Sequence, residues 1–248
     1  MGGYSEALQL VHRDVASPLR VYDLRNVPQD EQDALLAAWF DEERRNRFDW
    51  TRPPLFRLHV HRRTEHTLQA TLLCHHAILD GWSVASFLTE LFTAYLAHVG
   101  AARVPVAARP KTTFREYVAL ERAAVQDTEA RDYWTRHLAD SSPTVVPRWP
   151  LRASDRDAAS FTSRTAVLPA QVVSGIERAA ERARVPLKTI LLAAHMRVLG
   201  FVANERDVVT GVVTHGRTGG VDADRVLGLF LNTPPLRCAI DGSWIDLA

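Results

Sequence analysis

The sequence HHAILDGWS occupies residues 75–83 and decides how the chain around it is organised. The segment Thr67–Cys74 precedes it and predicts a β-strand. An apolar pattern with helical spacing follows it, and we predict that Ser83 caps this helix. The nine residues therefore form a turn between a strand and a helix, where side chains can be presented to a ligand.

Residue types within this turn are suited to chemistry. Because neighbouring side chains of an extended chain point to opposite faces, His75 and His76 are poorly placed to share a metal ion, and one should face a cavity while the other packs into the fold. A histidine titrates near neutral pH and can act as a general base. Asp80 could bind an arginine and hold the turn, and Gly81 would permit a tight or positive-φ conformation. The residues alone leave a structural and a functional role equally open.

Outward from the turn, strands and helices interleave, which indicates an α/β architecture in two parts. Residues 141–157 contain three prolines and no helical period, which is typical of a linker. We predict an N-terminal lobe at 1–145, a linker at 146–160 and a C-terminal lobe at 161–248. The predicted strands are 55–62, 67–74, 162–168 and 207–214, and the predicted helices are 30–45, 84–96, 114–124, 129–138, 170–184 and 187–202.

Composition excludes several classes of partner. Thirty basic and 29 acidic residues leave a net charge of +1, so no strong field favours nucleic acid or an anionic membrane. We find no signal peptide and no apolar run long enough to span a membrane, and we expect a cytoplasmic protein. The two cysteines, Cys74 and Cys238, lack metal-type spacing, and a reduced state is the simpler expectation.

Other candidate residues are weaker. Neither Ser83 nor Ser86 stands in a G-x-S-x-G elbow, and Cys74 has the surroundings of a core residue. We expect His195 to be packed within an apolar helix. We expect the three histidines of the hairpin, His59, His61 and His66, to be exposed.

Several stretches together resemble condensation domains of nonribosomal peptide synthetases, which belong to the chloramphenicol-acetyltransferase-like superfamily. Residues 75–81 match the HHxxxDG signature of that family, and Trp82-Ser83 often follows it. A second motif, with a G-x-F-x-N-T core, is matched by residues 228–233. Further matching segments are 48–49, 54–57, 114–117, 133–134 and 215–217.

The resemblance implies two chloramphenicol-acetyltransferase-like lobes with a tunnel between them. It implies that His76 is catalytic and either accepts the amine's proton or orients the amine. Asp80 would be structural, with Arg217 as its ion-pair partner, and a side chain at Gly81 would obstruct the acceptor. His75 would support the site. The tunnel would be lined by Trp82, Ser83 and Asn232.

The same resemblance implies no metal and no bound cofactor. Substrates would arrive on the phosphopantetheine arms of upstream and downstream peptidyl carrier domains, with an adenylation domain adjacent. Against complete members, the chain starts late and ends early, so we expect a domain that is incomplete at both ends. Three alternatives remain: an epimerisation domain, a free-standing acyltransferase and an inactive module that docks carrier proteins.

Overall fold

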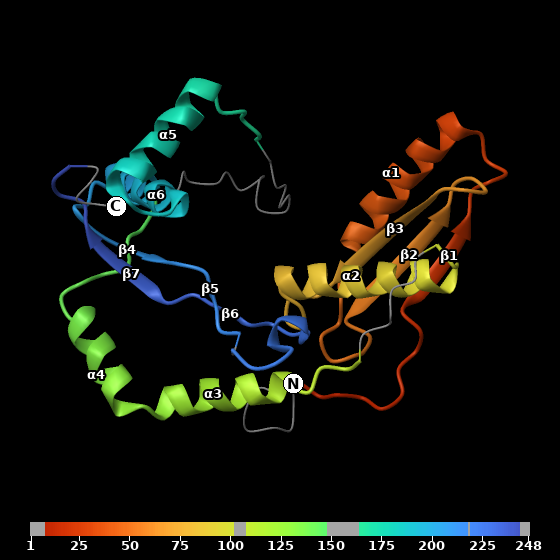
Figure 1. Ribbon diagram of the computed structural model, residues 1–248, viewed down its shortest axis with the longest axis horizontal. Helices are drawn as coiled ribbons and strands as arrows, with labels where there is room; N and C mark the ends of the chain where they lie inside the picture. The colour runs from red at the N-terminus through yellow and green to blue at the C-terminus, as the bar shows by residue number, and fades with distance from the viewer. Residues whose placement is uncertain (1–7, 102–107, 148–163, 218, 244–248) are drawn as a thin grey trace, which may run out of the picture. The chain divides into compact units, whose positions relative to one another are not determined.

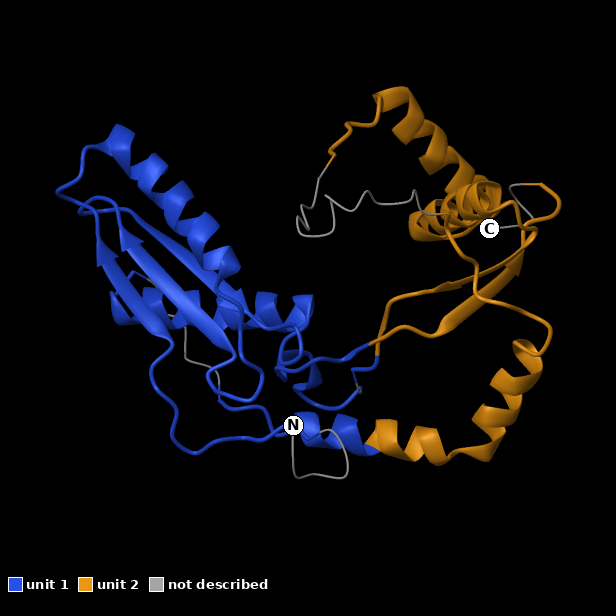
Figure 2. Ribbon diagram, turned by 180° about the vertical axis from the view of Figure 1, so that it is seen from behind, with its two compact units in different colours: residues 1–119, 216–231 blue, residues 120–215, 232–248 orange. Residues whose placement is uncertain are grey.

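The computed structural model describes residues 8–101, 108–147, 164–217 and 219–243. The chain forms two compact units, shown in blue and orange in Figure 2. Unit 1 comprises residues 1–119 and 216–231, and unit 2 comprises residues 120–215 and 232–248. Unit 1 therefore combines the signature stretch with a segment that lies more than a hundred residues further along the chain.

Unit 1 is built on a three-stranded sheet of β1 (Leu19–Asp23), β2 (Phe56–Arg62) and β3 (Leu68–Cys74), in the order β1-β2-β3. β1 pairs in parallel with β2, and β2 pairs antiparallel with β3, as the predicted hairpin requires. β1 was not predicted from the sequence, because its five residues carry no alternating pattern long enough to be distinguished from a loop. The elements of this part of unit 1 are β1 (Leu19–Asp23), α1 (Gln29–Arg45), β2 (Phe56–Arg62), β3 (Leu68–Cys74) and α2 (Gly81–His98).

The two faces of this sheet contact different helices. Phe56 of β2 packs against Phe87 of α2, with ring centroids 5.9 Å apart. His59 follows Phe56 by three residues on β2, and its ring centroid lies 4.9 Å from that of Trp39 on α1. Because successive strand side chains alternate between faces, α1 and α2 cover opposite faces.

Two histidines of β2 correct our sequence-based expectation. His59 and His61 are each only 3% exposed, whereas His66 at the hairpin turn is exposed as expected. A polar residue type does not by itself make a strand side chain exposed, because exposure depends on what packs over that face. The imidazoles instead pack among the rings of Tyr22 and Trp39.

Residues 216–231 pack against the start of α3 (Phe114–Gln126) within unit 1. Phe230 is 3% exposed, and its ring lies 4.9 Å from that of Tyr117 and 5.1 Å from that of Phe114. Val226 completes this cluster of buried apolar side chains. The short helix η2 (Ala223–Arg225) lies within the same segment.

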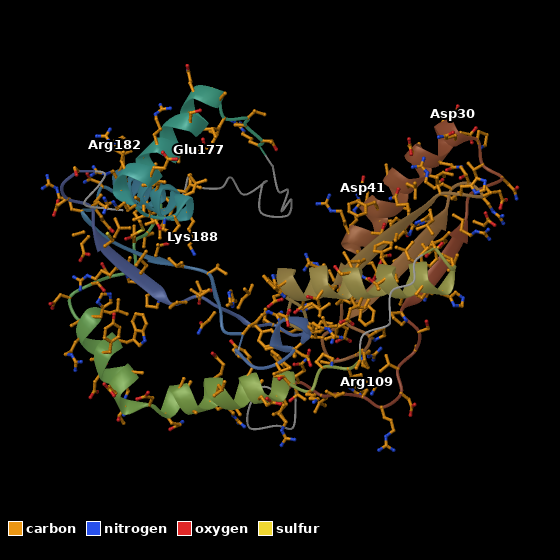
Figure 3. All side chains as sticks on the ribbon, in the orientation of Figure 1. Asp30, Asp41, Arg109, Glu177, Arg182 and Lys188 are labelled. Carbon is orange, nitrogen blue, oxygen red and sulfur yellow. The ribbon has the colours of Figure 1, made fainter. Side chains whose placement is uncertain are left out.

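Unit 2 contains a two-stranded antiparallel sheet covered by helices. β4 (Asp207–Gly211) pairs with β7 (Pro235–Ala239). α6 (Leu187–Ala203) packs on β4 and on α5 (Ala170–Ala183). Charged side chains on the outer surface of α5, such as Glu177 and Arg182, are exposed, as are Asp30 and Asp41 on α1 of unit 1 (Figure 3). The remaining elements are α4 (Thr128–His137), β5 (Thr214–His215) and β6 (Leu231–Asn232), and the boundary between the units falls within β6.

Three further observations bear on the sequence predictions. His195 on α6 is exposed, so the expectation that it is packed is wrong. Residues 164–168 form no strand, and the rest of the predicted strand at 162–168 and most of the predicted linker at 146–160 lie outside the described residues. Across the described ranges, no single helix is long and apolar enough to span a membrane; α5 and α6 pass that test only together, across a 106° bend.

Candidate active site

The signature turn, residues 75–83, begins where β3 ends at Cys74. The His75 N–H donates to the carbonyl of Leu55 at 2.8 Å, which fastens the start of the turn to the chain that enters β2. At the other end, Asp80 is the N-cap of α2, and its Oδ1 accepts from the Ser83 N–H at 2.7 Å. The helix therefore begins two residues before the predicted cap, Ser83, because the carboxylate satisfies an N–H of the first turn.

His75 is the packed member of the histidine pair. Its ring lies 6.3 Å from Phe48 in an edge arrangement and 5.4 Å from Trp50. Its Nδ1 accepts a hydrogen bond from the Ala77 N–H at 3.1 Å. These contacts hold the His75 ring within the turn, so His75 supports the turn that carries His76.

His76 is exposed, and one of its two ring nitrogens is already engaged. Its Nδ1 lies 2.9 Å from the carbonyl oxygen of Leu79. A carbonyl oxygen can only accept, so Nδ1 must carry the proton in this bond. In the neutral imidazole Nε2 then keeps its lone pair, and this nitrogen can accept a proton from a substrate.

Asp80 and Arg217 form the ion pair that the sequence analysis expected. Arg217 Nη2 lies 3.1 Å from Asp80 Oδ1, and the two side chains are 6% and 1% exposed. Asp80 Oδ2 also accepts from the Phe230 N–H at 3.1 Å. Arg217 Nη1 donates to the carbonyls of Ala223 and Val226 at 3.1 and 2.8 Å. The pair thus ties the start of α2 to the 216–231 segment.

The surroundings of Asp80 keep its carboxylate ionised. Burial by itself would raise the pKa of Asp80, because a charge is poorly solvated inside a protein. Hydrogen bonds from Ser83 and from the Phe230 N–H, together with the positive charge of Arg217, outweigh burial, and the pKa lies below the ordinary value. Asp80 is therefore a fixed negative charge, consistent with a supporting role.

The three residues predicted to line a tunnel are placed differently from one another. Trp82 is 57% exposed, and its indole N–H donates to the carbonyl of Asp224 at 2.8 Å. Asn232 is exposed and lies in unit 2, where its side-chain oxygen accepts from the Thr233 N–H at 2.7 Å. Ser83 differs from the expectation, because it is completely buried and its hydroxyl is occupied by protein partners.

Gly81 also differs in part from the expectation. Its φ does not fall in the left-handed region, so of the tight and the positive-φ conformations that this glycine would permit, the positive-φ one does not occur. A Cβ added at this position would meet no heavy atom within 4 Å. Open space beside Gly81 is compatible with the predicted approach of a substrate.

Sequence reasoning assigned no role to Gly228, although the structure places it in the site. Its carbonyl accepts from the Asp80 N–H at 3.0 Å and from the Ser83 hydroxyl at 2.8 Å. Its N–H donates to the same hydroxyl at 3.0 Å. Its position within the G-x-F-x-N-T motif was the only signal, and that motif alone does not indicate a partner in the signature turn.

A pocket of about 790 Å³ in unit 1 borders the signature turn. It is lined by Ala77 and Ile78 of the turn, by Trp50 and by largely apolar residues of segments 8–18 and 53–56. Within the described part of the chain, no group of three or more histidine, cysteine or acidic side chains is arranged to hold a metal ion.

The chain is similar in sequence to curated proteins. The chain is 37% identical over 243 residues to the AMB antimetabolite synthetase AmbE of Pseudomonas aeruginosa, a match that covers 97% of this chain and 11% of that protein. It is 30% identical over 242 residues to one of the linear gramicidin synthase proteins of Brevibacillus parabrevis, a match that covers 96% of this chain and 3% of that protein. The chain thus spans a small part of these relatives.

Solved structures show the same architecture. The first condensation domain of the calcium-dependent antibiotic synthetase, in complex with a substrate analogue, matches with a TM-score of 0.68 and 28% identity. The match covers 92% of this chain and 50% of that one. The family model named Condensation domain matches residues 3–244. This chain therefore belongs to the condensation-domain family, with its chloramphenicol-acetyltransferase-like fold.

Proposed function

We propose that this chain forms an amide bond in nonribosomal peptide synthesis, between an aminoacyl or peptidyl thioester donor and an aminoacyl acceptor. Both substrates would be carried on phosphopantetheine arms of upstream and downstream peptidyl carrier domains. An adjacent adenylation domain would load the acceptor carrier. Membership of the condensation-domain family supports this proposal.

One observation carries the proposal, the hydrogen bond between His76 Nδ1 and the Leu79 carbonyl at 2.9 Å. In the neutral ring, this bond leaves the lone pair on Nε2, which is the state a general base requires. His76 is exposed, so a substrate amine can reach this nitrogen. His75, packed against Phe48 and Trp50, is not free for the same task.

The chemical step is short. The acceptor amine attacks the thioester carbonyl, a C–N bond forms and the C–S bond breaks. Nε2 of His76 takes one proton from the amine and returns it to the leaving thiolate, which gives an amide and a free thiol. A thioester is already activated, so bringing the two substrates together supplies part of the rate and the base adds about 10²–10⁴-fold.

The test is dipeptidyl-carrier formation, followed by intact mass spectrometry, with donor and acceptor carriers loaded with simple aminoacyl groups. The chain would be assayed with both carriers supplied as separate proteins. We expect His76→Ala to lower the rate about 10²–10⁴-fold. His66→Ala, an exposed histidine outside the turn, is the matched control and should keep the wild-type rate.

Equal rates for wild type and His76→Ala would overturn the assignment of the base. If both carriers bind and no amide forms, exchange of the aminoacyl α-proton in heavy water distinguishes an epimerisation domain from an inactive docking module. Amide formation with a soluble amine alone would indicate a free-standing acyltransferase.

A further inference from the structure

We infer that Ser83 and Gly228 form a positioning device that sets the proton position and orientation of the His76 ring. The device acts through the peptide group between Leu79 and Asp80. This inference rests on the proposed function only for its effect on rate, since the predicted state of the ring can be measured without any reaction.

The peptide group between Leu79 and Asp80 is held from both sides. Its carbonyl accepts from His76 Nδ1 at 2.9 Å, and its N–H donates to the carbonyl of Gly228 at 3.0 Å. The six atoms of a peptide unit are coplanar, so its N–H and C=O turn together. Any rotation that loosens the bond to Gly228 also moves the oxygen that receives the His76 proton.

Gly228 is in turn held by the side chain of Ser83. The hydroxyl donates to the Gly228 carbonyl at 2.8 Å and accepts from the Gly228 N–H at 3.0 Å. It also accepts from Arg217 Nη2 at 2.8 Å. A hydroxyl has one proton to donate and two lone pairs, so these three bonds use its whole capacity. Ser83 thus fixes both polar groups of the residue that holds the Leu79–Asp80 peptide.

Burial means that water cannot replace the hydrogen bonds between Ser83 and Gly228. Ser83 has no exposed surface, and the hydrogen bonds it makes with Gly228 are buried. Removing the hydroxyl would leave the Gly228 N–H without a partner in a place where water has no access, and such a group is costly. A shift of the Gly228 backbone towards another partner is the expected response.

Close packing explains why position 228 is a glycine. A Cβ built on Gly228 would lie 2.2 Å from Cδ2 of Phe114, and 2.7 Å from its Cε2. The backbone can therefore lie between the aromatic cluster and the start of α2 only without a side chain. Phe114 limits movement of Gly228 on one side, and Ser83 binds its polar groups.

The first experiment measures the tautomer of His76 directly. The full chain, labelled with ¹⁵N in its histidines, would be studied by long-range ¹H–¹⁵N correlation NMR above the usual titration range of histidine. The resonances of His76 are identified by their loss in His76→Gln. We expect wild type to show the Nδ1–H form, and Ser83→Ala to show a mixture with the Nε2–H form. A wild-type ring in the Nε2–H form would overturn the inference whether or not any variant folds.

The second experiment measures amide formation by the same proteins. We expect Ser83→Ala to lower kcat about 10–100-fold, because small misplacements of a catalytic group have effects of this size. KM for both carriers should change less than about twofold, because the bonds lost do not touch them. Circular dichroism and thermal unfolding establish that the variant is folded at the assay temperature.

The matched control is Ser86→Ala on the next turn of α2. Its hydroxyl makes a single exposed contact, to the Asp224 carbonyl at 3.4 Å. This variant should retain the wild-type tautomer and kcat. If Ser83→Ala also keeps both, the inference is wrong. If the tautomer changes in Ser83→Ala while the wild type forms no amide, the positioning device stands and the proposed function fails.

Discussion

Unit 1 contains two buried polar clusters that are stabilised in different ways. Asp80, Ser83 and Arg217 hold a network in which both carboxylate oxygens and the hydroxyl have partners. His59 and His61 on β2 are equally buried, but His59 Nε2 and His61 Nδ1 make no hydrogen bond among the described residues. One cluster depends on charge and hydrogen bonds, and the other depends mainly on aromatic packing, with one hydrogen bond between the Tyr22 hydroxyl and His59 Nδ1 at 3.2 Å.

The surroundings of the two histidines favour the neutral imidazole. His61 stacks on Tyr22 at 4.6 Å and meets Trp39 edge-on at 4.6 Å. Burial lowers the pKa of both histidines. Glu43, 3.8 Å from His59 Nε2, opposes this by raising the pKa of His59, and the positive charges of Arg57 and Arg20 add to the lowering.

The difference between the clusters predicts that they respond in opposite ways to a change of pH and to substitution. The Asp80 cluster should tolerate ordinary changes of pH and fail when one partner is removed, because an unpaired buried charge is costly. The histidine cluster should tolerate replacement by an apolar ring and weaken in mild acid, because protonation would bury a charge. Substitutions in and beside the two clusters test this contrast, here in order of expected effect.

Asp80→Ala should have the largest effect. It leaves the guanidinium of Arg217, 6% exposed, without its counter-ion, and we expect the free energy of unfolding of unit 1 to fall by about 3–5 kcal/mol. Amide formation should fall with it. Urea unfolding at neutral pH measures the change.

Asp33→Ala is the control for this variant. Asp33 pairs with Arg63 at 2.5 Å in the same unit but is 74% exposed, so its loss should cost less than about 1 kcal/mol. Equal losses for Asp80→Ala and Asp33→Ala would show that burial of the Asp80–Arg217 pair has no energetic consequence.

His61→Phe should make the stability of unit 1 less sensitive to acid. A pKa that is lower in the folded state means that the unfolded chain binds more protons as the pH falls below about 6.5. Stability that is present at neutral pH is therefore lost between that value and the lower folded pKa. Each proton taken up on unfolding changes the free energy by about 1.4 kcal/mol per pH unit.

Urea unfolding between neutral pH and mildly acidic pH, followed by tryptophan fluorescence, measures this slope. His61→Phe should flatten it, whereas His66→Phe at the exposed hairpin turn should leave it unchanged. A wild-type stability that is constant over the range would contradict the assignment of neutral buried imidazoles.

Gly81→Ala should have the smallest effect on stability. No atom lies within 4 Å of the added Cβ, and φ is ordinary, so the fold should be unchanged or stabilised by about 0.5–1 kcal/mol through helix propensity. If the acceptor substrate passes this position, kcat/KM should nevertheless fall. Thermal unfolding and the amide assay separate the two effects, and Gly81→Leu extends the series.

The sequence predicted the main helices and the hairpin well. The helix at 30–45 was confirmed as α1 (Gln29–Arg45) and the strand at 67–74 as β3 (Leu68–Cys74), because each has a clear apolar period. β1 was missed because a parallel partner far along the chain, not its own pattern, makes it a strand. The burial of His59 and His61 was predicted wrongly because exposure depends on what packs above the strand.

By itself, the sequence determined the family, the signature turn and the identity of the residues in it, since motif and spacing are local properties of the chain. It also indicated the partner of Asp80, through the resemblance. Only the tertiary structure decided that Gly228 and Ser83 complete the site, because their hydrogen bonds join segments separated by 145 residues. It also decided which histidine packs and which is exposed, since that depends on rings brought by distant parts of the chain.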